Sequence, residues 1–87
     1  MKSLEEILIH LKQCIEDISV GAFVAHNISN SDSLMIDLGL DSLDFASVML
    51  MTENWLKISI PESKVNWNTI QTVNDLALMF DGFQNAP

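Results

Sequence analysis

A serine between two aspartates is the clearest candidate for chemistry in this 87-residue chain. It lies in the run DLGLDSLD, which extends from Asp37 to Asp44 and precedes a segment with helical periodicity. A serine at the head of a helix projects from a turn of the chain, so we expect the hydroxyl of Ser42 to be exposed. A phosphodiester on that hydroxyl would lie where the unpaired N–H groups and the dipole of the helix stabilise anions. The alternative interpretation is that Ser42 is an ordinary capping residue.

Ser42 lacks the neighbours that a catalytic nucleophile requires. Neither His10 nor His26 is close to it in sequence, and no G-x-S-x-G elbow surrounds it. The histidines have no partner at metal-ligand spacing, so we expect no metal site. Cys14, the only cysteine, falls on the apolar side of a predicted helix and is expected to be a buried structural thiol. These features predict a protein that is not an enzyme.

Three helices are predicted to position the serine. The first covers residues 3–20, with a capping box at its start and Gly21 as its stop signal. The second begins at Asp41 or Ser42 and extends to about Leu56, with Asp41 as its N-cap. The third begins after Thr72 and ends at Gly82.

The segments between these helices are predicted to be irregular. Residues 21–40 form a long loop, and residues 62–67, after Pro61, form a short helix or an irregular turn. Trp67 is expected to cover the end of the bundle, and residues 84–87 to be a frayed tail. The predicted fold is an all-α, single-domain bundle (residues 1–87) of three main helices and one short one. Six apolar side chains are expected to anchor the long loop to the core: Phe23, Val24, Ile28, Leu34, Met35 and Leu38.

The charge of the chain limits its partners. Twelve Asp and Glu residues against four lysines give a formal net charge of −8. Nucleic acid and anionic membranes are therefore disfavoured, whereas basic protein surfaces are complementary. The chain shows neither a transmembrane-length apolar run nor the apolar core of a signal peptide. We expect a soluble, cytoplasmic monomer.

The serine run and two downstream segments together carry a family resemblance. The segments are Ile60-Pro61 and the stretch from Thr72 to Asp75. At this spacing they resemble the acyl carrier protein family over Asp37 to Phe80, about half the chain. The resemblance implies a covalent 4′-phosphopantetheine arm on Ser42, with Asp41 and Leu43 beside it. A separate phosphopantetheinyl transferase would attach the arm, which would carry an acyl-type group as a thioester to other enzymes.

The resemblance also assigns the faces of the second helix. One row is expected to point inward, either as ordinary core or as an acyl pocket, and another to face partner enzymes with basic patches. The inward row is Phe45, Val48, Met49, Thr52 and Leu56. The partner face is Asp41, Leu43, Asp44, Ala46, Ser47, Leu50 and Glu53.

The chain departs from the common fatty-acid pattern on this helix. Ser47, Asn54 and Trp55 stand where typical members carry acids. The departure favours a carrier for polyketide, nonribosomal-peptide or other specialised acyl metabolism. Primary fatty acid biosynthesis stays open as an alternative. An acidic helical adaptor without a prosthetic group is the alternative from a different class.

Overall fold

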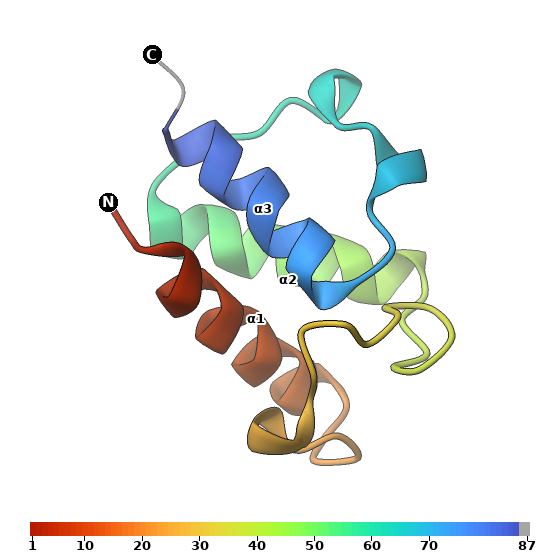
Figure 1. Cartoon of the computed structure of the whole chain (residues 1–87). Coiled ribbons are helices and arrows are strands. Elements are labelled where there is room, and N and C mark those ends of the chain that lie inside the picture. Colours follow the sequence, from red (N-terminus) through yellow and green to blue (C-terminus); the bar gives the residue numbers. More distant parts are fainter. Residues whose placement is uncertain (86–87) are drawn as a thin grey trace.

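A computed structural model describes residues 1–85, and three α-helices make up most of that part of the chain (Figure 1). They are α1 (Leu4–Ile18), α2 (Ser42–Leu56) and α3 (Val73–Gln84). Short 3₁₀ turns occur at Ala25–Asn27, Glu62–Lys64 and Trp67–Thr69, and none of the described residues forms a strand. This is the all-α bundle that the sequence predicts.

Every α-helix begins with a reciprocal capping box. In each, the N-cap side chain accepts the backbone N–H of the third helical residue, whose carboxylate accepts the N–H of the N-cap. Each box satisfies two backbone donors that the helix itself leaves free, so the helix starts are fixed by local sequence. The pairs are Ser3 with Glu6, Asp41 with Asp44, and Thr72 with Asp75.

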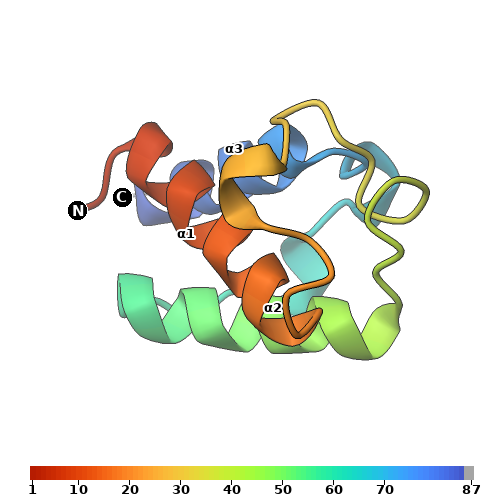
Figure 2. The ribbon, with the colours of Figure 1, turned by 90° about the horizontal axis from the view of Figure 1, so that it is seen from below.

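α1 is the helix against which both others pack. In two perpendicular views α1 runs in one direction and α2 and α3 run back in the other (Figures 1 and 2). The start of α2 therefore lies at the end of the bundle away from the N-terminus. The contact surfaces bury a core in which α1 and α3 contribute most of the fully buried side chains: Ile7, Leu11, Ile15, Leu34, Val48, Val73, Leu76 and Phe80, with Thr52 as the buried polar member.

The long loop is fixed to the start of α3. The N–H of Leu34 donates to the carbonyl of Gln71 at 2.9 Å, and the N–H of Val73 donates to the carbonyl of Asp32 at 3.1 Å. An isolated antiparallel bridge joins Ser33 and Thr72 between these two bonds. The loop that leads to Ser42 is therefore held against the start of α3.

Several expected boundaries were wrong. α1 ends at Ile18, two residues before the expected end, because Val20 and Gly21 turn the chain with φ of 54° and 81°. α3 continues past Gly82 to Gln84. By contrast, residues 62–67, predicted to be a short helix or an irregular turn, do contain such turns, since the chain forms the 3₁₀ turns Glu62–Lys64 and Trp67–Thr69.

The expected frayed tail was wrong at Gln84. The amide oxygen of Gln84 accepts the N–H of Lys2 at 3.1 Å, and its amide nitrogen donates to the carbonyl of Lys2. This pairing holds the first residues of the chain against the end of α3, which explains why the helix continues beyond Gly82. Residues 86–87 of the expected tail lie outside the described residues.

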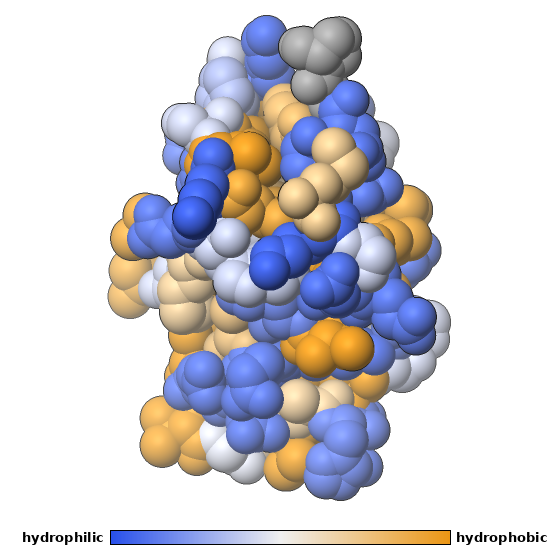
Figure 3. Space-filling model, turned by 90° about the vertical axis from the view of Figure 1, so that its left-hand side faces the viewer, coloured by the Kyte–Doolittle hydropathy of each residue, from blue (hydrophilic) through white to orange (hydrophobic). Residues whose placement is uncertain are grey.

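Val24 and Met35 were wrongly expected to anchor the loop. Ile28, Leu34 and Leu38 are buried and Phe23 packs against the core, but Val24 and Met35 are exposed. The face near the N-terminus carries small apolar areas separated by polar ones (Figure 3). Within residues 1–85, no helix is long and apolar enough to cross a bilayer.

Candidate functional site

Ser42 is the first residue of α2, and its side chain is exposed. Asp41, the N-cap, points its carboxylate at the N–H of Asp44 at 2.9 Å, and Asp44 returns the bond to Asp41 at 3.2 Å. Among the hydrogen bonds of the described residues, none uses the N–H of Ser42 or of Leu43. The hydroxyl therefore stands beside two backbone donors at the positive end of a 15-residue helix.

A tight turn delivers the chain to this position. Gly39 has φ of 64°, a left-handed conformation that glycine adopts without a side-chain clash. Leu38 and Leu40, on either side of it, are buried. The N–H of Leu40 donates to the carbonyl of Leu34 at 2.9 Å, which closes the turn. The glycine thus allows both leucines to enter the core just before the helix starts.

The two rows of α2 separate as the 3.6-residue period predicts. Leu43 and Leu50 are 75% and 61% exposed, and Ala46 is exposed between them. Val48 and Thr52 are fully buried, whereas Phe45, Met49 and Leu56 are half-buried. The outward row is therefore available to a partner, and the inward row splits into core residues and residues that reach the surface.

A cavity of about 550 Å³ opens beside Ser42. The inward row contributes only Phe45 and Met49 to its lining. Val48 and Thr52 are core residues, and Leu56 is partly buried against the core. The sequence analysis missed the loop side chains that complete this lining, because no local pattern indicates which loop residue meets which helix. They come from both long connections: Met35, Ile60, Glu62, Trp67 and Ile70.

Trp67 forms the outer part of this wall. Its ring meets that of Phe45 edge-on, with centroids 6.2 Å apart and planes at 80°. Trp67 is still 42% exposed. It therefore borders the cavity beside Ser42 and does not simply cover the end of the bundle.

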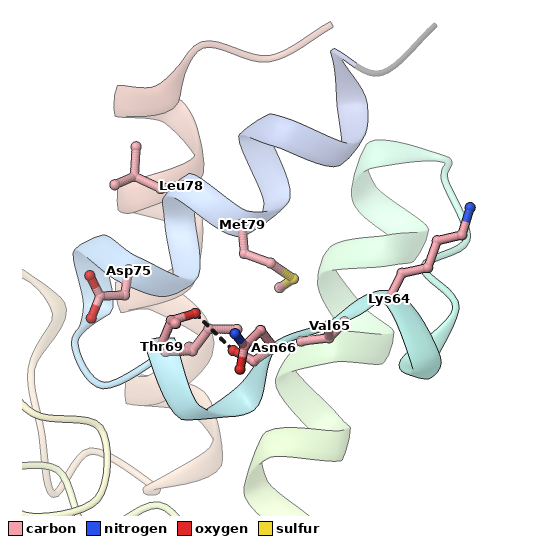
Figure 4. Close-up of a pocket in the computed structure, with 8 residues that line it drawn as sticks. Lys64, Val65, Asn66, Thr69, Asp75, Leu78 and Met79 are labelled. Atoms are coloured by element: carbon pink, nitrogen blue, oxygen red, sulfur yellow. Dashed lines mark hydrogen bonds between the residues drawn. The ribbon is translucent and has the colours of Figure 1, made fainter.

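A second cavity, of about 350 Å³, lies between residues 64–70 and α3 (Figure 4). The amine of Lys64 points away from it, and its other polar groups already serve the backbone (Figure 4). The Asp75 carboxylate accepts the N–H groups of Gln71 and Thr72, both at 3.1 Å, and these bonds lower the pKa of Asp75. The hydroxyl of Thr69 donates to the carbonyl of Asn66 at 2.8 Å. This cavity therefore offers no chemical group comparable to Ser42.

The acidic residues of the predicted partner face have local bonding roles. Asp41 and Asp44 form the capping box, and the carboxylate of Glu53 accepts the N–H of Ile60 at 2.8 Å. Ser47 is half-buried. The exposed surface of α2 near Ser42 is consequently more apolar than the list of acids suggests.

The polar groups between α1 and α2 form a separate structural cluster. His10 Nε2 lies 3.1 Å from Thr52 Oγ1 and 3.3 Å from Cys14 Sγ. The His10 ring stacks on Trp55 with centroids 4.1 Å apart. Burial lowers the pKa of His10 and raises that of the Cys14 thiol to about 11, so both are suited to packing and neither to nucleophilic chemistry. Across residues 1–85, no three His, Cys, Asp or Glu side chains gather as metal ligands do.

Comparison with protein families gives a match that includes this site. Residues 11–80 match the family described as "Phosphopantetheine attachment site". The chain belongs to this family. A comparison with curated protein sequences gave no match. Members attach 4′-phosphopantetheine covalently, so the chain is a carrier protein of the acyl carrier type.

The residues of this carrier protein fit such a group. The exposed hydroxyl of Ser42 offers an oxygen for attachment, and the N–H groups of Ser42 and Leu43 offer donors to a phosphate. Family members typically serve as substrates of other enzymes, among them a phosphopantetheinyl transferase and acyl-processing enzymes. A carrier serine needs no base of its own, because the transferase supplies it.

Proposed function

We propose that this carrier protein accepts 4′-phosphopantetheine on Ser42 and presents acyl-type groups to separate enzymes of specialised metabolism. The observation that carries the proposal is the exposed hydroxyl of Ser42 at the first position of α2, within the matched region. When bound, the group supplies a terminal thiol that holds an acyl group as a thioester.

The residues around Ser42 prepare the hydroxyl for modification by an external enzyme. The Ser42 oxygen would attack the pyrophosphate of coenzyme A and form the new phosphodiester bond. The pyrophosphate bond would break, adenosine 3′,5′-bisphosphate would leave, and a base of the transferase would take the serine proton. Asp41 and Asp44 hold the helix start in place, and their carboxylates are directed at backbone N–H groups. The free N–H groups of Ser42 and Leu43 then stabilise the added negative charge.

The surface of α2 supports a specialised pathway. The helix contains only two acids, Asp44 and Glu53, and both accept backbone N–H groups. Trp55 is engaged with His10, and Ser47 and Asn54 are neutral. Partners that read an acidic stripe, as those of primary fatty acid synthesis would, find few free carboxylates here. Polyketide and nonribosomal-peptide enzymes are the proposed partners, with primary fatty acid synthesis as the alternative.

The attachment site is tested by incubation with coenzyme A and a broad-specificity phosphopantetheinyl transferase, followed by intact-protein mass spectrometry. The wild type should gain the mass of one phosphopantetheine. Ser42→Ala should gain none, whereas Ser59→Ala, which removes an exposed serine outside the predicted partner face, should gain it like the wild type. A folded wild type that stays unmodified would favour the adaptor alternative. Mass spectrometry of the loaded carrier from its native host would then identify the cargo and the pathway.

A further inference from the structure

The cavity beside Ser42 is apolar along most of its length and acidic at its other end. On α2 its lining starts at Ser42 and ends at Glu53, about 16 Å further along the helix axis. Glu62 adds a second carboxylate from the connection that follows α2. It comes two residues after Ile60, to which Glu53 is hydrogen-bonded, so both acids belong to the same part of the cavity. We call Glu53 and Glu62 the acid pair.

The acid pair keeps hydrogen-bond acceptors that the protein does not use. Oε2 of Glu53 accepts the N–H of Ile60 at 2.8 Å, which fixes this half-buried carboxylate between α2 and the next connection. Among the hydrogen bonds of residues 1–85, none uses Oε1 of Glu53 or either carboxylate oxygen of Glu62. The acid pair therefore has three oxygens left for a donor on the cargo.

The wall next to the acid pair is aromatic and carries no positive charge. Trp67 lines the cavity and contacts Phe45 edge-on, with ring centroids 6.2 Å apart. An indole ring attracts cations through the negative face of its π-system. None of the four lysines of the chain contributes to the lining. The carboxylates and the ring thus act in the same direction on a charged group that enters.

We propose that this cavity selects cargo that carries an ammonium group, that is, aminoacyl thioesters, and rejects acyl groups that end in a carboxylate. The inference rests on the proposed function and names the chemical class of its cargo. Glu53 and Glu62 would accept the N–H bonds of the ammonium, and Trp67 would cover it. The apolar walls, among them Phe45 and Met49, would contact the carbon atoms of the cargo and of the arm.

Charge decides between the classes of cargo. A malonyl group would bring its carboxylate to the acid pair of a chain whose formal net charge is −8, and would be repelled. A hydrocarbon chain would remove water from the acid pair and return no hydrogen bond. An ammonium replaces that water with charge-assisted hydrogen bonds, so it is the group that the cavity accommodates best.

The test compares three cargos on the full chain. A broad-specificity phosphopantetheinyl transferase would load Ser42 from the β-alanyl, butanoyl or malonyl thioester of coenzyme A, and intact-protein mass spectrometry would verify the loading. β-Alanyl and butanoyl have the same number of non-hydrogen atoms and differ by an ammonium in place of a methyl group. Malonyl carries a carboxylate instead.

The two tryptophans provide the readout by nuclear magnetic resonance. The indole N–H signal of Trp67 should move furthest with β-alanyl, less with butanoyl and not at all with malonyl, relative to the protein with an unacylated arm. Trp55 stacks on His10 and does not line the cavity, so its indole signal is the internal control and should stay in place.

Three variants assign the effect to the acid pair. Glu62→Gln and Glu53→Gln should each lower the equilibrium constant for entry of the β-alanyl group about threefold. Glu53→Gln keeps an oxygen for the N–H of Ile60, and Glu62 is exposed, so circular dichroism should show both variants folded. Glu5→Gln removes an exposed acid from the start of α1 and is the control for net charge. It should behave like the wild type.

The outcomes separate this inference from the proposed function. A Trp67 signal that moves as far with butanoyl or malonyl as with β-alanyl, or with none of the three, would overturn this inference alone. So would an effect of β-alanyl that Glu62→Gln and Glu5→Gln leave equally large. A wild type that is not modified at Ser42 would overturn the proposed function and this inference with it.

Discussion

Asp41 and Asp44 hold one another's backbone at the start of α2. The carboxylate of Asp41 accepts the N–H of Asp44 at 2.9 Å, and the carboxylate of Asp44 accepts the N–H of Asp41 at 3.2 Å. Ser42 lies between the two residues and takes its position from them. Asp41 is therefore a structural residue of the site as well as a predicted contact for partners.

Replacing Asp41 separates these two roles. Asp41→Ala should lower the free energy of unfolding by about 1 kcal/mol, because the Asp44 N–H loses its acceptor. Asp41→Asn keeps an acceptor oxygen and should stay within about 0.3 kcal/mol of the wild type. Urea unfolding followed by circular dichroism measures both. Equal losses in the two variants would assign the effect to the charge of Asp41 and not to its hydrogen bond.

Cys14 should be silent in a thiol titration of the native protein. At pH 8 a thiol with a pKa of about 11 is ionised in only about one molecule in a thousand, and the side chain is buried. Ellman's reagent should therefore detect no thiol before modification by the transferase and one thiol afterwards. In urea the counts should become one and two. Rapid reaction of the unmodified native protein would contradict the burial of Cys14.

His10 should make stability depend on pH. Burial lowers the pKa of His10 in the folded protein below its ordinary value of 6.5. At a pH between the folded and the unfolded pKa, the unfolded chain therefore binds a proton that the folded chain does not. The free energy of unfolding should then fall as the pH drops through 6.5, by at most about 1.4 kcal/mol per pH unit for one proton.

Urea titrations between pH 5 and pH 8 measure this dependence. His10→Gln should flatten the curve, whereas His26→Gln, which changes an exposed histidine, should keep it. A His10→Gln curve as steep as that of the wild type would place the responsible proton elsewhere.

Thr52 should matter for stability and not for the cargo. Its hydroxyl is fully buried and lies 3.1 Å from His10 Nε2, so Thr52→Val should cost about 1 kcal/mol by removing this hydrogen bond and leaving His10 Nε2 only its contact with Cys14 Sγ. The variant should still load acyl groups like the wild type, because Thr52 does not line the cavity beside Ser42. Met49→Ala changes that lining and should alter the rate at which a bound acyl group is hydrolysed. Equal hydrolysis rates in Thr52→Val and Met49→Ala would mean that the cavity does not hold the acyl group.

The helix starts could be predicted from sequence because their signals are local. Thr72 and Asp75 are three residues apart and cap each other whatever surrounds them. The end of α3 could not be predicted in this way, because Gly82 is a local stop signal. The bonds that carry the helix past it join Gln84 to Lys2, 82 positions away.

The candidate site, too, could be predicted only in part. The position of Ser42 followed from its immediate neighbours and from the family resemblance. The cavity wall did not, because Trp67 and Met35 reach α2 through the folding of both connections. Glu53 shows the same limit: its position on the predicted partner face followed from the sequence, but the bond that its carboxylate accepts from the N–H of Ile60, seven residues on, did not.

The pairing of Lys2 with Gln84 has a practical consequence. It fixes the first residues and the end of α3 at one pole of a molecule 37 Å long, while Ser42 lies towards the other pole (Figure 1). A tag, a fluorophore or a sensor chip attached through Met1 would therefore leave the Ser42 pole facing solution. Binding partners could be measured on the immobilised protein without the linker standing in their way.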